Sequence, residues 1–150
     1  MKKILTGAFL LCFSNVLFAQ IQHPVSWTSS SKKINDKTYE IHLTANINKG
    51  WHIYSQTTAE GGPIPTNISF TKNPLLVING KTKEVGKLEQ RHEALFGVDV
   101  KQFSDKVDFV QLVKLKAPVK TSVDVAVEFM VCNDKECLPP ITKKMSVALK

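Results

Sequence analysis

The segment Val123-Asp124-Val125-Ala126-Val127-Glu128-Phe129-Met130-Val131-Cys132 alternates apolar and more polar residues over ten positions. In a β-strand, alternate side chains point to the same face. The four valines and Phe129 are therefore predicted to share a buried face. Cys132 ends this strand on the opposite face, where we expect a partner to be able to reach its sulfur.

A second cysteine follows closely, since only Asn133-Asp134-Lys135-Glu136 separates Cys132 from Cys137. Leu138-Pro139-Pro140 comes next, and a new alternating segment begins after it, with Ile141, Met145, Val147 and Leu149 on one face. Asn and Asp favour turns, so the two cysteines are predicted to flank a short hairpin turn. This arrangement would place them well for a disulfide bond.

Such a bond could be structural or redox-active. In the chain-entropy model a loop of about six residues stabilises a fold by roughly 2 kcal/mol, against roughly 4.7 kcal/mol for about a hundred residues. Disulfides of exported domains are more often structural. The short loop and the expected exposed face favour a redox role, and both interpretations remain open on this evidence.

The N-terminus predicts export. Met1-Lys2-Lys3 precedes a mainly apolar run, Ile4 to Phe18, and Ala19-Gln20, which is typical of a signal peptide cleaved after Ala19. We expect residues 1–19 to be removed, together with Cys12, and residues 20–150 to form one domain. No later apolar run approaches the roughly 20 residues of a membrane helix.

The charge of the chain does not indicate a nucleic-acid partner. Loss of Lys2 and Lys3 would lower the formal net charge from +7 to +5. The remaining lysines are interspersed with acidic residues, which is typical of a solvated surface and not of a nucleic-acid patch. An acidic protein partner stays compatible with this pattern.

The rest of the chain predicts an all-β fold. No helical period is sustained, and the segment from Ser55 to Pro65 contains Gly61, Gly62 and two prolines that exclude regular structure. Val85 to Phe96 has no clear period and is left unassigned. Strands are expected at Val25–Lys33 as an edge, Tyr39–Ile47, Trp51–Tyr54, Ile68–Phe70, Leu75–Ile78, Val98–Phe103 and Val107–Lys116, with turns at Asn48–Gly50, Asn73-Pro74 and Asn79-Gly80. Seven to nine short strands predict an immunoglobulin-like β-sandwich.

Few other groups suggest chemistry. His23, His42, His52 and His92 lack the spacing of metal ligands, so we expect no metal site and no cofactor. A copper site using Cys132, Cys137 and Met130 is an alternative based on soft sulfur ligands. No Ser/His/Asp set or carboxylate pair supports hydrolysis.

Three segments together resemble a known family. They are Gly50-Trp51-His52-Ile53-Tyr54, Glu93-Ala94-Leu95-Phe96-Gly97 and, above all, Cys132 through Cys137-Leu138-Pro139-Pro140. In this order they resemble the N-terminal periplasmic domain of the thiol:disulfide interchange protein DsbD. The chain departs from that pattern at Leu95, where the family's cap carries an aromatic residue, and at His52, which matches a position where the family has an aromatic residue beside the cysteines. Its cysteine loop is also shorter by one residue than in the best-known member.

The resemblance implies a periplasmic immunoglobulin-like domain, expected to be a monomer, whose Cys132–Cys137 pair alternates between disulfide and dithiol. Electrons would come from a membrane-embedded reductase or a thioredoxin-like donor on another polypeptide and pass to exported thioredoxin-fold oxidoreductases. Glu93 to Gly97 would form a cap loop over the cysteines, with Leu95 and Phe96 as shielding side chains. His52 and Tyr54 would lie beside the pair.

The residues are also compatible with thiol–disulfide exchange as chemistry. Asp134, Glu136 and Glu93 are expected to surround the pair with negative charge opposed only by Lys135, which would disfavour the thiolate. Cys132 ends a strand held by its ladder, and we expect neighbouring strands, including the one that bears His52 and Tyr54, to enclose its sulfur. Pro139-Pro140 behind Cys137 removes two ladder donors, so Cys137 is expected to meet an incoming thiolate first and to release Cys132. The alternatives are a non-catalytic binding domain with a structural disulfide and a copper-handling protein.

Overall fold

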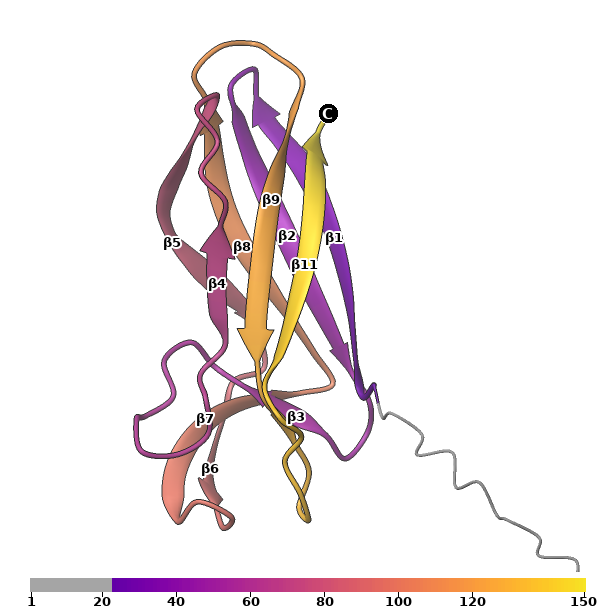
Figure 1. Ribbon diagram of the computed structural model, residues 1–150, viewed down its shortest axis with the longest axis vertical. Coiled ribbons are helices and arrows are strands. Elements are labelled where there is room, and N and C mark those ends of the chain that lie inside the picture. Colours follow the sequence, from indigo (N-terminus) through magenta and orange to yellow (C-terminus); the bar gives the residue numbers. More distant parts are fainter. Residues whose placement is uncertain (1–22) are drawn as a thin grey trace, which may run out of the picture.

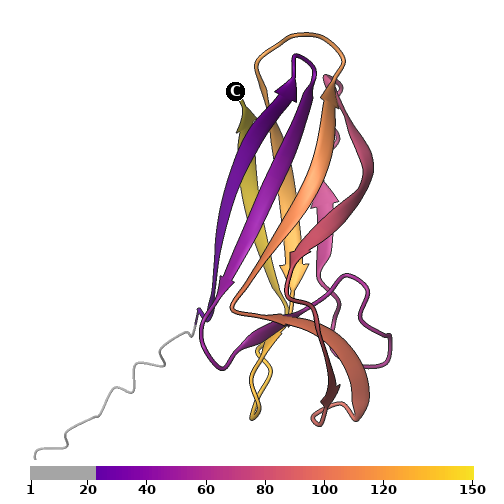
Figure 2. The same ribbon diagram turned by 180° about the vertical axis from the view of Figure 1, so that it is seen from behind.

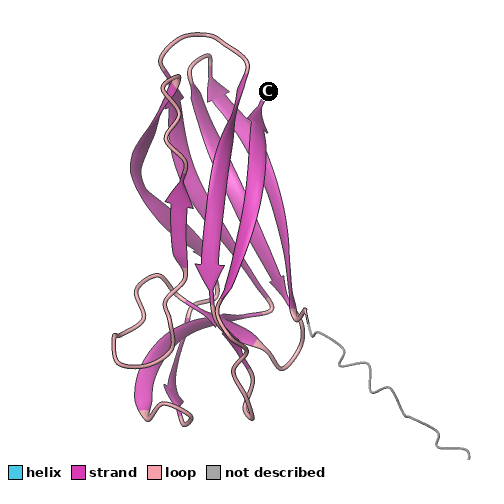
Figure 3. Cartoon of the chain, in the orientation of Figure 1, coloured by secondary structure: helices cyan, strands magenta, loops and turns pink. Residues whose placement is uncertain are grey.

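The computed structural model describes residues 23–150, where the chain forms eleven strands and no helix (Figure 3). The predicted signal peptide, residues 1–19, lies outside the described residues. In chain order the strands are β1 (Val25–Asn35), β2 (Thr38–Ile47), β3 (His52–Tyr54), β4 (Asn67–Phe70), β5 (Leu76–Gly86), β6 (Glu89–Glu93), β7 (Val98–Ser104), β8 (Lys106–Leu115), β9 (Thr121–Phe129), β10 (Val131–Cys132) and β11 (Ile141–Leu149). The number exceeds the seven to nine predicted, because β6 lies in the unassigned segment and β10 is separate from β9.

Two antiparallel sheets form the predicted immunoglobulin-like sandwich (Figures 1 and 2). One sheet has the order β1-β2-β8-β5 and the other β11-β9-β4. As predicted, β1 is an edge strand. β8 is central in this sheet, since it pairs with both β2 and β5. The inward faces alternate as expected for half-buried strands; their buried residues include Ile41, Leu43, Phe109, Val113, Val123, Val125, Val127, Val147 and Leu149.

Trp27 closes the core beside the edge strand. Its ring stacks on Phe109 with centroids 5.8 Å apart, and it meets the Phe129 ring at 5.2 Å. Phe109 belongs to one sheet and Phe129 to the other, so Trp27 connects the two layers by aromatic contact.

A third sheet, β10-β3-β7-β6, lies at one end of the sandwich (bottom of Figure 1). It begins where the predicted Asn48–Gly50 turn leads from β2 into β3, with Gly50 at φ +84°. Alternate residues of β3 face opposite ways: Ile53 packs into the main core, whereas Tyr54 joins a separate small cluster. This third sheet positions the cysteines.

The predicted single strand Val123–Cys132 is interrupted at Met130. β9 pairs with β11 and β4, but β10 pairs with β3 of the third sheet, as Val131 to Ile53 and Cys132 to His52. The alternation of side chains continues across the break, so the pattern alone gave no sign that the chain changes sheets.

Asn79-Gly80 does not form the turn that the sequence predicted. Both residues lie inside β5, where the pairing with β8 shifts register between Asn79 and Lys83. Gly80 has φ +73°, a conformation that glycine adopts readily at a bulge. The strand therefore continues to Gly86 instead of ending at Ile78.

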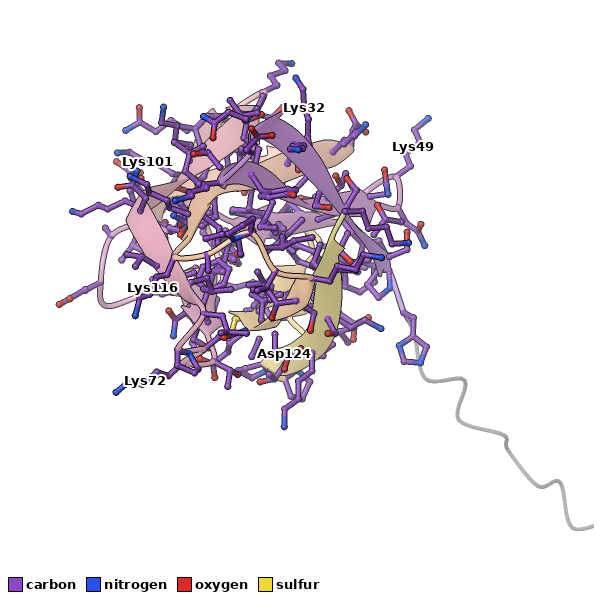
Figure 4. The ribbon with its side chains drawn as sticks, turned by 90° about the horizontal axis from the view of Figure 1, so that it is seen from above. Lys32, Lys49, Lys72, Lys101, Lys116 and Asp124 are labelled. Carbon is purple, nitrogen blue, oxygen red and sulfur yellow. A yellow bond between two sulfur atoms is a disulfide. The ribbon has the colours of Figure 1, made fainter. Side chains whose placement is uncertain are left out.

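The charged side chains are distributed around the sandwich. In Figure 4, Lys32, Lys49, Lys72, Lys101 and Lys116 lie on different sides of the molecule. No helix in residues 23–150 is long and apolar enough to cross a membrane.

Candidate functional site

Cys132 and Cys137 are joined in a disulfide with their Cα atoms 4.1 Å apart. They flank the predicted turn, which continues toward β11 (gold, bottom of Figure 1). Asn133 fixes the turn: its side-chain oxygen accepts hydrogen bonds from the backbone N–H groups of Lys135 at 2.8 Å and Glu136 at 2.9 Å. Its own N–H donates to the Glu136 carbonyl at 2.9 Å. Local hydrogen bonding thus holds the two cysteines at the base of a tight turn.

The two sulfur-bearing residues differ in burial. Cys132 has no exposed surface, and Cys137 is half-buried. Cys132 clusters with Tyr54 and Val100, and the partly buried Val98, Met130 and Cys137 pack against this group. The third sheet therefore covers the face of the strand that the alternation alone left open. The expectation that neighbouring strands, including the one with His52 and Tyr54, enclose the Cys132 sulfur agrees with this burial.

His52 lies directly opposite Cys132 in the β3–β10 pair. Its Nε2 atom is 3.0 Å from the Tyr54 hydroxyl and 3.2 Å from Glu93 Oε2. The Tyr54 hydroxyl donates a hydrogen bond to the same Glu93 oxygen at 3.0 Å. All three side chains are buried, so the structure brings these predicted site residues together in one polar network behind the disulfide.

Burial sets the protonation of this network. It lowers the pKa of His52 from its ordinary value, and the hydrogen bond and charge of Glu93 only partly oppose the effect. Burial, followed by the hydrogen bond to Glu93, raises the pKa of Tyr54 above its usual range. At neutral pH His52 is therefore mainly uncharged and Tyr54 is protonated.

The predicted cap is a tight turn between β6 and β7. The Glu93 carbonyl accepts hydrogen bonds from the N–H groups of Phe96 at 3.1 Å and Gly97 at 2.8 Å, and Gly97 has φ +67°. Leu95 and Phe96 are 48% and 37% exposed. Glu93 thus points into the site, whereas Leu95 and Phe96 project substantially into solvent.

The charge near the turn differs from the expectation that only Lys135 opposes the acids. Arg91 of β6 pairs with Asp134, with Nη2 3.4 Å from Oδ1. Both side chains are more than half exposed, so their mutual attraction is screened by water. Arg91 nevertheless supplies a second positive charge that the chain order did not reveal.

Residues of β7 that surround Cys132 were not predicted from the sequence. Val98, Val100 and Gln102 alternate along β7, and Val100 and Gln102 are buried. Gln102 lies opposite Tyr54, and neither polar atom of its side chain has a hydrogen-bond partner in the described part of the chain. The alternation was visible in the sequence, but it could not indicate that this face covers a cysteine.

A metal centre is not indicated by the described residues. Between residues 23 and 150, no group of three or more His, Cys, Asp and Glu side chains is arranged to hold a metal ion. Met130 packs against the cysteine cluster.

A family model described as "Thiol:disulfide interchange protein DsbD, N-terminal" matches residues 22–149. This range includes both cysteines, the predicted cap segment Glu93 to Gly97 and the His52–Tyr54–Glu93 network. No curated protein matches the chain in sequence.

Solved structures share the fold at low sequence identity. The reduced DsbD N-terminal domain of Neisseria meningitidis is 12% identical, with a TM-score of 0.50, over 81% of this chain and 84% of that chain. The same domain in complex with the PilB N-terminal domain is 12% identical, with a TM-score of 0.51, over 85% and 87%. The N-terminal periplasmic domain of ScsB from Proteus mirabilis is 16% identical, with a TM-score of 0.53, over 83% of this chain and 44% of that chain.

Proposed function

Because this chain belongs to the family of the N-terminal domain of the thiol:disulfide interchange protein DsbD, we propose that it relays electrons through the Cys132–Cys137 pair. The donor is a membrane-embedded thiol reductase or a thioredoxin-like protein. The acceptors are exported oxidoreductases of the thioredoxin fold. Family membership supports thiol–disulfide exchange as the activity. The electron relay and the identity of its partners are what we propose in addition.

The observation that carries the proposal is a disulfide in a short turn at the end of the sandwich, with one half-buried sulfur-bearing residue. The sequence separation of the cysteines is five, so the bond closes too short a loop to contribute more than about 2 kcal/mol through chain entropy. Exchange requires an accessible sulfur for in-line attack by a thiolate. Cys137 is the partly exposed residue of the pair, whereas Cys132 is buried, which supports attack at Cys137.

Reduction of the domain takes place in two steps. A donor thiolate attacks Cys137 Sγ, the Cys132–Cys137 bond breaks, and its electron pair leaves on Cys132, which takes up a proton. A second donor thiol then attacks the mixed disulfide and releases Cys137, so two electrons reach the domain and the donor becomes a disulfide. The reverse sequence passes the electrons to an acceptor.

Export belongs to the same proposal. We propose that residues 1–19 direct secretion and that residues 20–150 act in the periplasm. The ScsB domain of the same fold is described as periplasmic. The solved complex between the DsbD and PilB N-terminal domains supports docking of another protein domain on this fold.

The reduction potential of the pair tests the function. A potential between about −180 and −270 mV, the range of known thiol-transfer proteins, is expected, whereas a value below about −300 mV would mark a structural bond. Equilibration of the domain with glutathione or dithiothreitol buffers, followed by thiol alkylation and mass measurement, gives this number. The domain should also exchange electrons with a thioredoxin. A domain that exchanges electrons neither with these redox buffers nor with a thioredoxin would exclude the relay.

A further inference from the structure

We propose that His52 accepts the proton of Cys132 when the reduced pair passes its electrons on. This inference rests on the proposed exchange at Cys132 and Cys137 and adds a specific base to it.

The geometry places the imidazole beside the buried cysteine. His52 and Cys132 are direct partners in the two-residue pairing of β3 with β10, and directly opposed residues have Cβ atoms about 4.5–5.5 Å apart on one face of the sheet. Cys132 is 0% exposed and His52 is 4% exposed. Their side chains therefore lie side by side on one face of the sheet, with little access for water.

The two nitrogens of the His52 ring have different surroundings, and we assign Nδ1 to the Cys132 thiol. Nε2 faces the Tyr54 hydroxyl and Glu93 Oε2. The Tyr54 hydroxyl already donates to this carboxylate oxygen, so an N–H on Nε2 completes the pattern by donating to it as well. In that tautomer the lone pair is on Nδ1, which is the ring nitrogen nearer to the backbone of β3.

Electron donation creates the need for a base. Cys137 first attacks the acceptor disulfide and forms a mixed disulfide, and Cys132 must then attack Cys137 Sγ. Only the thiolate is the nucleophile, and burial disfavours the charged form of Cys132. Since water has little access, a neighbouring side chain that takes the proton would accelerate this step.

The proposed step balances in atoms and electrons. The Cys132 thiol gives its proton to Nδ1 of neutral His52, and its sulfur attacks Cys137 Sγ. The bond between Cys137 and the acceptor sulfur breaks, and the acceptor leaves as a thiolate with the electron pair. The products are the Cys132–Cys137 disulfide, an imidazolium at His52 and a reduced acceptor, and the imidazolium later returns its proton to solvent.

The charges around His52 suit a base that becomes transiently cationic. Glu93 lies 3.2 Å from the ring and would stabilise the imidazolium, as a carboxylate does for the base of a nucleophile–base–orienter set. Asp134 acts in the same direction from the turn, and Arg91 opposes it from β6. The lowered pKa of His52 keeps the ring neutral before the step, which is the form that a base requires.

A two-phase reaction with an aromatic disulfide isolates the step. The reduced domain is mixed with excess 5,5′-dithiobis(2-nitrobenzoate) in a stopped-flow instrument, and release of thionitrobenzoate is followed at each pH. Attack by Cys137 releases the first equivalent in a phase that depends on reagent concentration. Ring closure by Cys132 releases the second in a phase that does not, and mass measurement verifies that the product is the internal disulfide.

The wild-type domain is compared with His52→Gln and His52→Tyr, with His92→Gln as a matched control, because His92 is solvent-exposed on β6. At pH 7 we expect the second phase to slow about tenfold or more in both His52 variants, since general base catalysis typically contributes roughly 10²–10⁴-fold. The first phase should be unchanged, and the second-phase rates should converge with wild type near pH 10, where the thiol ionises without help. Glu93→Gln should give an intermediate loss.

The results separate this inference from the function on which it rests. If the wild type releases two equivalents and closes its disulfide, but the second phase of the His52 variants equals that of wild type from pH 6 to 8, the base assignment is wrong and the relay stands. If the wild type never closes its disulfide, the relay itself fails. A uniform slowing that persists at pH 10 would assign His52 a structural role and also overturn the inference. If His52→Gln does not fold, His52→Tyr and Glu93→Gln decide by the same readout.

Discussion

Cys137 remains half-buried, whereas Cys132, to which it is bonded, has no exposed surface. The difference arises because Cys132 is paired with His52 inside the third sheet, while Cys137 stands on the return side of the turn. An attacking thiolate therefore has different access to the two sulfurs of one bond.

The unequal access predicts unequal trapping of a partner. In Cys132→Ser, the lone Cys137 should capture a thioredoxin-like protein whose own resolving cysteine has been removed, and in Cys137→Ser the lone Cys132 should capture it poorly. Non-reducing electrophoresis of the mixed disulfides measures both yields. Equal yields, or a higher yield through Cys132, would contradict the assignment of Cys137 as the attacked residue.

Reduction of the disulfide should leave the fold intact. The loop closed by the bond is short, so the entropic loss is about 2 kcal/mol, which corresponds to a melting temperature lower by roughly 5–10 °C for a domain of this size. The sandwich core should persist without the bond, because most of its residues belong to strands of the two main sheets. Thermal melts with and without dithiothreitol measure the shift, and loss of a cooperative transition on reduction would favour a structural disulfide.

The cap should control access without changing the potential. We expect Leu95→Ala combined with Phe96→Ala to accelerate reduction by dithiothreitol by a few-fold, because shielding affects the rate of attack and not the energy difference between the two redox states. The effect should be modest, since both side chains are already partly exposed. Val119→Ala, at an exposed position in the β8–β9 loop at the other end of the sandwich, is the control, as Figure 1 illustrates. An unchanged rate in the double variant would mean that these residues do not shield the cysteines.

His52 should make the stability of the domain depend on pH. Its pKa in the fold lies below the ordinary value of 6.5, so the unfolded chain binds a proton before the folded chain does. The stability that depends on an uncharged His52 is thus fully present above pH 6.5. The free energy of unfolding then decreases as the pH falls from 6.5 through the lowered pKa of His52 in the folded chain. Urea unfolding between pH 8 and pH 5 should show a steeper loss for wild type than for His52→Gln, with His92→Gln behaving like wild type. Parallel curves for wild type and His52→Gln would contradict the burial argument.

The strand pattern of the sandwich was predictable because it depends on local alternation. Tyr39 to Ile47 buries every second residue, and the sequence displays this period directly. The hairpin turn at Asn133 was predictable for a similar reason, since its hydrogen bonds connect residues at most three positions apart. The exported nature of the chain and the relay function stay predictions.

The sequence by itself determined an all-β chain, the positions of most strands, and a cysteine pair poised on a short turn, because each depends on neighbouring residues. Only the tertiary structure decided which sheet each strand joins. The alternation from Val123 to Cys132 continues unbroken while the chain passes from β9 to β10, so this period alone gave no sign that the strand leaves the sandwich for the third sheet. The contact of His52 with Glu93, 41 positions away in the chain, likewise exists because β7 pairs with both β3 and β6, and long-range pairing of this kind is not encoded in any local period.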